Sequence, residues 1–273
     1  MLGAIIGDIC GSRYEWANIR SKQFQLFKRQ CRVTDDSVMT LAIAKALLAY
    51  DQLPVEDRRI EKLGEIATAS MQEMGKKYPR AGYGGRFYDW IFSDDPQPYN
   101  SWGNGASMRV SPCAYAGETL EEALALSDAV TEVTHNHPEG IKGARAITAA
   151  TWLARHGKSQ DEIREHIQEN YYSLDFKLDQ IRKTYKFDVS CQGSVPQAIE
   201  AFLEGDSFED CIRNAISIGG DSDTIACMAG AIAEPFWGVP KDIREAAMRF
   251  MNEEQVTILN HFEKRYQSNT SCR

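Results

Sequence analysis

Two short acidic clusters, far apart in the chain, constrain the fold more than any other feature. Thr34-Asp35-Asp36-Ser37 and Asp221-Ser222-Asp223-Thr224 each offer two carboxylates and a threonine hydroxyl, and each directly precedes an apolar, helix-like run. Four carboxylates brought together would repel one another, and two divalent cations would relieve that repulsion. Oxygen ligands of this kind favour Mg²⁺ or Mn²⁺ over Zn²⁺. If the fold joins the two clusters, they form a two-metal site.

Either cluster alone has a simpler interpretation, which is helix capping. Thr, Asp and Ser commonly precede helices and satisfy free backbone N–H groups. The run that follows the second cluster, Ile225 to Ala233, is rich in small residues, which let a helix lie deep in the core. Carboxylates at the start of a buried helix are costly unless they are paired or bound to metal, and the helix N-terminus offsets only part of that cost. Two such clusters in one chain therefore favour metal binding.

Most of the sequence predicts helix, and the alternating pattern of strands is hard to find. We predict an all-α fold with about a dozen helices, in one compact domain over residues 1–267 followed by a flexible tail over 268–273. The predicted helical segments are 37–50, 56–77, 119–133, 140–155, 159–171, 195–203, 207–216, 224–233, 242–251 and 253–266. Loops are predicted at 17–33, 78–112 and 134–140, and the second is long enough to suggest a functional role.

The charge balance and the distribution of cysteines exclude several classes of protein. Lys and Arg number 31 against 39 Asp and Glu, so a general affinity for nucleic acid is not expected. No window approaches the roughly 20 apolar residues of a membrane span, and no signal peptide is evident. The seven cysteines lack zinc-site spacing and fit reduced thiols. We expect a cytoplasmic protein without a membrane partner. We also expect a monomer, because no part of the sequence stands out as a subunit interface.

Further segments could carry chemistry. The glycine-rich run from Ser101 to Arg109 could hold a phosphate on its backbone N–H groups, although Asn104-Gly105 is also a common turn. His135 and His137 lack the helical spacing of a zinc pair, so hydrogen bonding in a pocket is favoured. Aromatic residues of the second loop could stack on a base or simply pack the loop. They are Tyr83, Phe87, Tyr88, Trp90 and Trp102.

The N-terminal segment, residues 3–15, contains three glycines within nine residues. This pattern indicates close helix packing or a tight turn. Taken alone, Glu15 at its end is most simply an ordinary exposed glutamate. Asp8 is interpreted as a structural residue that caps a helix or anchors a loop.

Five motifs together resemble the ADP-ribosylglycohydrolase family, the group that includes the dinitrogenase reductase-activating glycohydrolase. In order they are Gly-Asp-x-x-Gly-Ser-x-x-Glu, Thr-Asp-Asp-Ser, Gly-Asn-Gly-x-x-Met-Arg, Thr-His-x-His-Pro-Glu-Gly and Gly-Gly-Asp-Ser-Asp-Thr-Ile-Ala. The resemblance spans nearly the whole chain, and the combination is specific although each motif alone is not. It implies an all-α fold and a binuclear Mg²⁺ or Mn²⁺ centre.

The resemblance also implies roles for individual residues. Glu15 matches the catalytic glutamate. The positions of the metal ligands are Thr34, Asp35, Asp36, Asp221, Asp223 and Thr224. The positions that bind substrate are Gly103, Asn104, Gly105, Met108, His135 and His137. The implied reaction hydrolyses the bond at ribose C1″ between ADP-ribose and an acceptor on a protein or small molecule, through an oxocarbenium-like state. Arginine is the first acceptor expected.

Three alternatives remain open at this point. A two-metal phosphohydrolase would release AMP from ADP-ribose, because paired metals also clamp phosphate esters. A non-catalytic module would bind ADP-ribose tightly without turnover, and the complete set of acidic residues disfavours it. A purely structural helical protein would bind neither metal nor nucleotide.

Overall fold

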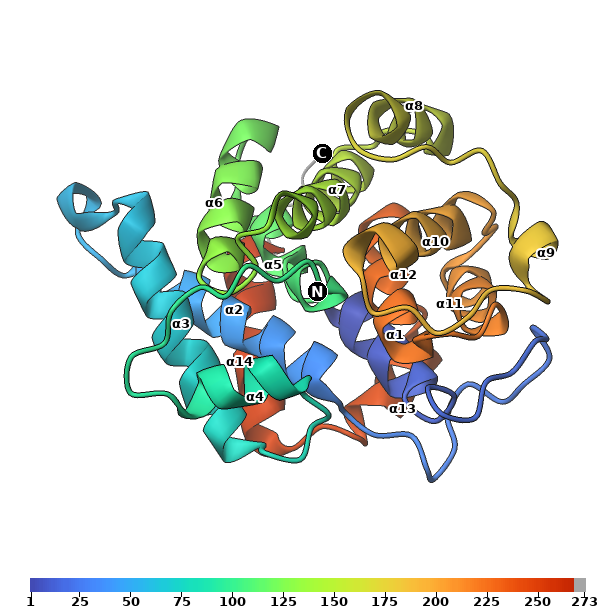
Figure 1. Ribbon diagram of the computed structural model, residues 1–273, viewed down its shortest axis with the longest axis horizontal. Coiled ribbons are helices and arrows are strands. Elements are labelled where there is room, and N and C mark those ends of the chain that lie inside the picture. Colours follow the sequence, from blue (N-terminus) through green and yellow to red (C-terminus); the bar gives the residue numbers. More distant parts are fainter. Residues whose placement is uncertain (268–273) are drawn as a thin grey trace.

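The helix α12 (Ser222–Trp237) lies at the centre of the molecule (Figure 1). Its residues 222–233 are all buried, because they are mostly small or aliphatic and allow neighbours to approach from every side. The helices that pack around it include α1 (Leu2–Gly11), α7 (Pro138–Arg155), α10 (Cys191–Leu203) and α11 (Phe208–Ser217). The computed structural model describes residues 1–267, and the second acidic cluster lies at the start of its central helix.

The contact between α1 and α12 brings the two backbones together at three glycines. Gly3, Gly7 and Gly11 recur at every fourth position on one face of α1. A Cβ atom on Gly7 would lie 2.0 Å from the carbonyl oxygen of Ala226, and one on Gly11 would lie 2.5 Å from the Cα of Asp223. Only glycine permits this approach. The sequence interpretation of close helix packing is therefore confirmed, and the contact brings the start of the chain to the second acidic cluster.

The first acidic cluster begins α2 (Asp35–Asp51), a helix whose residues from Asp36 to Ala44 are all buried. This helix packs against α1, α3 (Ile60–Lys77), α5 (Ser111–Ala116) and α14 (Glu253–Tyr266). The remaining α-helices are α4 (Gly85–Phe92), α6 (Leu120–Glu132), α8 (Gln160–Asn170), α9 (Leu178–Ile181) and α13 (Lys241–Met248). Short 3-10 turns occur at η1 (Val55–Asp57) and η2 (Asn104–Ala106).

The all-α prediction is confirmed, because residues 1–267 contain no strand and only one isolated bridge, between Gly103 and Ser190. The predicted tail, 268–273, lies outside the described residues. Over the described part of the chain, no helix has both the length and the apolar character needed to cross a membrane. The six cysteines in this part are unpaired.

Sequence reasoning was wrong about parts of the 78–112 segment, which was expected to be a loop. It contains α4 and η2, and α5 begins at Ser111. Phe87, Trp90 and Ile91 are buried on one face of α4 at helical spacing, and the preceding glycines concealed this short amphipathic pattern. Similarly, α10 begins at Cys191 rather than near Val195, because Ser190 caps it and Pro196 is accommodated inside.

Candidate active site

A single cleft of about 540 Å³ receives carboxylates from three separate segments of the chain. Glu15 comes from the turn after α1, Asp35 and Asp36 from the start of α2, and Asp221 and Asp223 from the start of α12. Thr224 and the glycine-rich turn also line this cleft. The fold therefore joins the two acidic clusters, as the sequence analysis required of a metal site.

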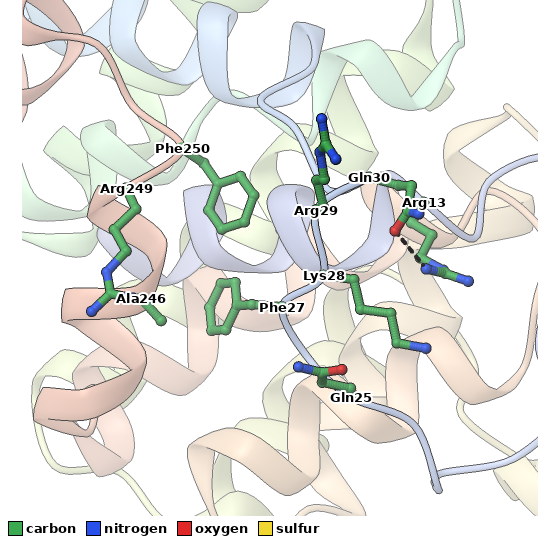
Figure 2. A pocket seen from close by; sticks show the side chains of 9 residues that line it. All are labelled: Arg13, Gln25, Phe27, Lys28, Arg29, Gln30, Ala246, Arg249 and Phe250. Carbon is green, nitrogen blue, oxygen red and sulfur yellow. Dashed lines mark hydrogen bonds between the residues drawn. The ribbon is translucent and has the colours of Figure 1, made fainter.

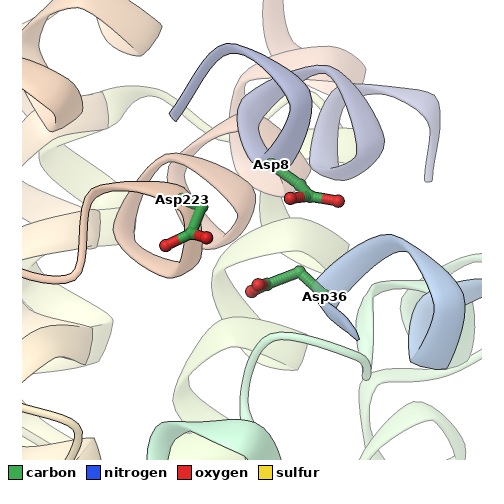
Figure 3. Close-up of side chains that lie close together, drawn as sticks. All are labelled: Asp8, Asp36 and Asp223. Carbon is green, nitrogen blue, oxygen red and sulfur yellow. The ribbon is translucent and has the colours of Figure 1, made fainter. Parts of the chain in front are cut away.

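The first acidic group consists of Asp8, Asp36 and Asp223, whose side chains converge from α1, α2 and α12 (Figure 3). One carboxylate oxygen of each lies within 4.8 Å of the others. Asp8 also accepts hydrogen bonds from the backbone N–H groups of Thr34, at 3.0 Å, and Ser37, at 3.1 Å. Asp8 thus caps α2, in agreement with its structural interpretation, and in addition belongs to the acidic group.

The second acidic group consists of Glu15, Asp221 and Asp223, again with oxygens within 4.8 Å of one another. Asp221 accepts a hydrogen bond of 2.7 Å from the side-chain amide of Asn104. This bond ties the second group to the glycine-rich turn. Asp223 is shared by both groups, so the two groups form one continuous acidic surface.

Burial and mutual repulsion raise the pKa of these carboxyl groups. The pKa of Asp36 and that of Asp223 lie well above the usual value, first because of desolvation and then because of neighbouring aspartates. The pKa of Asp35 rises to about 8 through burial and the charge of Asp8. Burial and then Asp221 raise the pKa of Glu15.

One oxygen of Asp36, Oδ1, is buried without a hydrogen-bond partner. A buried carboxylate oxygen without a partner is costly, and a cation is the partner that best compensates its charge. The donors gathered here are hard carboxylate and hydroxyl oxygens, which suit divalent cations of the Mg²⁺ type. The residues therefore fit a metal centre.

The glycine-rich turn and His135 form another part of the cleft wall. Four of the residues assigned by resemblance to substrate binding in this turn line the cleft, together with the histidine: Gly103, Asn104, Gly105, Met108 and His135. The backbone N–H of Asn104 donates to the carbonyl of Val189 at 2.7 Å, which fixes the turn against the segment before α10. Its glycines face the imidazole of His135.

Two of the residues assigned by resemblance lie beside the cleft rather than on its wall. His137 caps α7, since its Nδ1 accepts the backbone N–H of Glu139 at 3.1 Å, and its ring packs against Trp102. Thr34 is buried, and its hydroxyl donates to Asp8. Neither is among the residues that line the cleft.

The aromatic residues of the cleft are only partly those expected. Tyr83 and Phe87 line it, whereas Trp90 is on the buried face of α4 and does not. Sequence reasoning missed Trp16 and Phe187, whose rings stack with centroids 5.1 Å apart at the edge of the cleft. Trp16 is 78% exposed. A tryptophan directly after the candidate catalytic glutamate was the available signal, but its partner lies more than 170 positions away in the chain.

A second hollow, of about 630 Å³, lies where residues 25–30 meet the end of α13 (Figure 2). The rings of Phe27 and Phe250 stack at its base with centroids 5.9 Å apart. Its charged residues are Arg13, Lys28, Arg29 and Arg249. Within the described part of the chain, none of these four cations forms an ion pair, and no carboxylate lines the hollow.

Comparisons with known proteins agree with this geometry. A family model described as ADP-ribosylglycohydrolase matches residues 1–265. The protein named ADP-ribosylhydrolase ARH3 is 25% identical in Xenopus tropicalis, over 99% of this chain and 97% of its own length. In Homo sapiens it is 29% identical, over 88% and 84%. ADP-ribosyl-[dinitrogen reductase] glycohydrolase of Rhodospirillum rubrum is 25% identical, over 87% and 84%.

A solved structure titled ADP-ribosylglycohydrolase-related protein complex has the same fold, with a TM-score of 0.66 and 20% identity. The match covers 96% of this chain and 95% of the other. The family model spans nearly every described residue, including both acidic groups and the glycine-rich turn. The chain therefore belongs to the ADP-ribosylglycohydrolase family and is a glycohydrolase.

Proposed function

We propose that the chain hydrolyses the glycosidic bond at ribose C1″ between ADP-ribose and a protein side chain, and that it requires two divalent cations, Mg²⁺ or Mn²⁺. One observation carries the proposal. Two acidic groups that share Asp223 lie in the same cleft as a glycine-rich turn. Such an arrangement offers a cation site and a phosphate site close enough together for one ADP-ribose group to occupy both.

The proposed cation ligands are the oxygen donors of both clusters, and Asp8 supports them from behind by capping α2. We assign as ligands Thr34, Asp35, Asp36, Asp221, Asp223 and Thr224. When bound, the cations would polarise the ribose hydroxyls and lower the pKa of a water molecule. Thr34 and Thr224 both place their hydroxyls near Asp36 Oδ2, at 3.2 Å and 3.4 Å, and so orient that carboxylate.

Glu15 is the proposed catalytic residue. It is half-buried at the cleft wall, and burial together with Asp221 raises its pKa. A carboxylate with a raised pKa is a better proton acceptor near neutral pH. Glu15 can therefore take a proton from the attacking water, or hold the 2″-hydroxyl or the leaving group.

The rest of the cleft suits the nucleotide. In the turn from Gly103 to Gly105, the backbone N–H of Gly105 can hold the diphosphate, with Met108 and His135 beside it, because the N–H groups of Gly103 and Asn104 already donate within the protein. We place His137 in a supporting role, because it fixes the start of α7 directly after the segment of His135. The stacked pair of Trp16 and Phe187 offers an aromatic face for a base.

The acceptor is proposed to be arginine. The name of the Rhodospirillum relative indicates a protein substrate, dinitrogen reductase, and this supports a protein acceptor for the present chain. We further propose that the chain acts as a monomer in the cytoplasm. Neither a membrane nor general nucleic-acid binding enters the proposal, in line with the net charge of −8.

The test is release of ADP-ribose by the purified protein from arginine-ADP-ribosylated and serine-ADP-ribosylated peptides, each with Mg²⁺ and with EDTA. Release from the arginine peptide only when Mg²⁺ is present is the expected result. Release from the serine peptide alone would replace arginine by serine as the proposed acceptor and would leave the proposed hydrolysis of the glycosidic bond unchanged. AMP as the product would favour a phosphohydrolase, and binding of ADP-ribose without release from either peptide would favour a binding module.

A further inference from the structure

Arg109 is fully buried among the residues that line the cleft. Within residues 1–267 it forms no ion pair, and its Nε and Nη1 have no hydrogen-bond partner. The ring of Phe87, 5.5 Å from the guanidinium carbon, gives partial compensation. Burial of an unpaired cation is costly, so its remaining contacts indicate what the side chain does.

The third guanidinium nitrogen of Arg109, Nη2, donates to the hydroxyl of Thr134 at 2.6 Å. That hydroxyl oxygen lies 2.6 Å from Nδ1 of His135 and 3.3 Å from the carbonyl oxygen of Thr131. A hydroxyl has one proton to donate. Because it accepts from a cation, the hydroxyl becomes a stronger donor, and the shorter contact is the one to the imidazole. The shorter contact favours a Thr134 proton that points at Nδ1, and this arrangement would leave the imidazole proton on Nε2.

The Nε2 atom of His135 faces the glycine-rich turn. A Cβ atom on Gly105 would lie 3.3 Å from it, and one on Gly103 would lie 3.6 Å away. The absence of side chains at these two positions leaves room for a ligand oxygen in front of the Nε2–H group. Burial, and then the charge of Arg109, lowers the pKa of His135 well below its usual value, so the ring is a neutral donor.

We propose that Arg109 is a positioning residue which, through Thr134, holds His135 as the Nε2–H tautomer that donates to an oxygen of the ligand at Gly103–Gly105. The identity of that oxygen, a diphosphate oxygen of ADP-ribose, rests on the proposed function. The tautomer does not, because it follows from contacts within the protein alone.

The tautomer is measured by long-range ¹⁵N–¹H NMR of the protein labelled at histidine, without ligand. Two other histidines serve as internal standards of opposite kind. His156 Nδ1 lies 2.7 Å from the carbonyl of Trp152 and must carry its proton there, whereas His137 Nδ1 accepts from Glu139. The His135 signals are those lost in His135→Gln. We expect them to resemble those of His137, and a resemblance to those of His156 would overturn the proposal.

Thr134→Val removes the hydroxyl and keeps the shape of the side chain. We expect the tautomer preference of His135 to be lost and the affinity for ADP-ribose to fall about tenfold, with an unchanged circular dichroism spectrum. Thr134→Ser retains the hydroxyl and should restore both, and Arg109→Lys should weaken the preference. If the tautomer of His135 is unchanged in Thr134→Val, the proposed effect of Arg109 on His135 through Thr134 is overturned. If the tautomer changes and the affinity for ADP-ribose does not, the proposed contact between His135 and the ligand is overturned. Failure of the unmodified protein to bind ADP-ribose would instead contradict the proposed function. The NMR result would still decide whether Arg109 and Thr134 set the tautomer of His135.

Discussion

The acidic cleft and the basic hollow differ in how deeply their charges are buried. Asp8, Asp36 and Asp223 are at most 3% exposed and point at one another. In the basic hollow, Arg29 and Arg249 are exposed, and the remaining two cations are only partly buried. Solvated charges repel weakly and need no partner, whereas buried like charges carry a large cost unless a counter-ion or proton compensates them. The charges of the cleft therefore need compensation by a cation or by protons, and those of the hollow do not.

The largest effect is expected from the substitution Asp223→Asn in the acidic cleft, since this residue belongs to both acidic groups. Loss of a shared cation ligand removes several kcal/mol of transition-state stabilisation, so we expect kcat to fall about a thousandfold. The rise in Tm on adding Mg²⁺ should also shrink. Asp242→Asn, at an exposed position in the first turn of α13, is the control and should behave as the unmodified protein. Normal turnover in Asp223→Asn would remove this residue from the site.

The next effect concerns the half-buried carboxylate. Glu15→Gln should lower kcat about a hundredfold, because the amide cannot take a proton. Calorimetry should still detect Mg²⁺ binding, because the aspartates of α2 and α12 remain. Glu165→Gln on the exposed face of α8 is the matched control. Near-normal turnover in Glu15→Gln would contradict the proposed catalytic role of Glu15.

The cost of burying these charges should be visible in the pH dependence of stability. An aspartate has a pKa of about 3.9 in the unfolded chain, whereas that of Asp35 in the folded chain is about 8. Between these values the folded state binds more protons, so the free energy of unfolding falls as pH rises. In EDTA, urea titrations should show lower stability at pH 8 than at pH 5, and Mg²⁺ should restore stability at pH 8. A flat profile in EDTA would contradict the compensation argument.

The smallest effect is expected at the basic hollow. Arg29→Ala combined with Arg249→Ala should change kcat/KM less than about twofold and the free energy of unfolding by no more than about 0.5 kcal/mol, because both side chains are exposed. Peptide assays at low and moderate salt would measure this. A tenfold loss at low salt would show that the hollow takes part in substrate binding after all.

The sequence predicted the helices that carry the acidic clusters because their signals are local. A run of small and aliphatic residues predicts a buried helix, and carboxylates at its start predict a cost that a cation can relieve. The short helix α4 was missed because glycines and aromatics hid its periodicity. Nothing local to Asp8 shows that it faces Asp223, since that depends on a helix contact more than 200 residues apart in sequence.

Arg109 illustrates the same limit elsewhere in the cleft wall. It follows the glycine-rich motif, yet its importance depends on the hydroxyl of Thr134 and on the imidazole beyond it. Trp16 and Phe187 likewise come together at the cleft only when the chain folds and their rings stack. Residue type and spacing identify which groups can do chemistry, whereas the partners that orient them come from distant segments.

The glycine contact between α1 and α12 has a consequence for which ions the cleft accepts. At Gly7 and Gly11 the backbones touch, so no side chain separates the helices that carry Asp8 and Asp223 at these two positions. The fold therefore sets the spacing of the two helix backbones from which these carboxylates extend. Bonds from oxygen to Ca²⁺ are about 0.4 Å longer than those to Mg²⁺. If the cleft binds cations as proposed, helices that cannot move apart would favour the smaller ion, and the three glycines of α1 would set that preference.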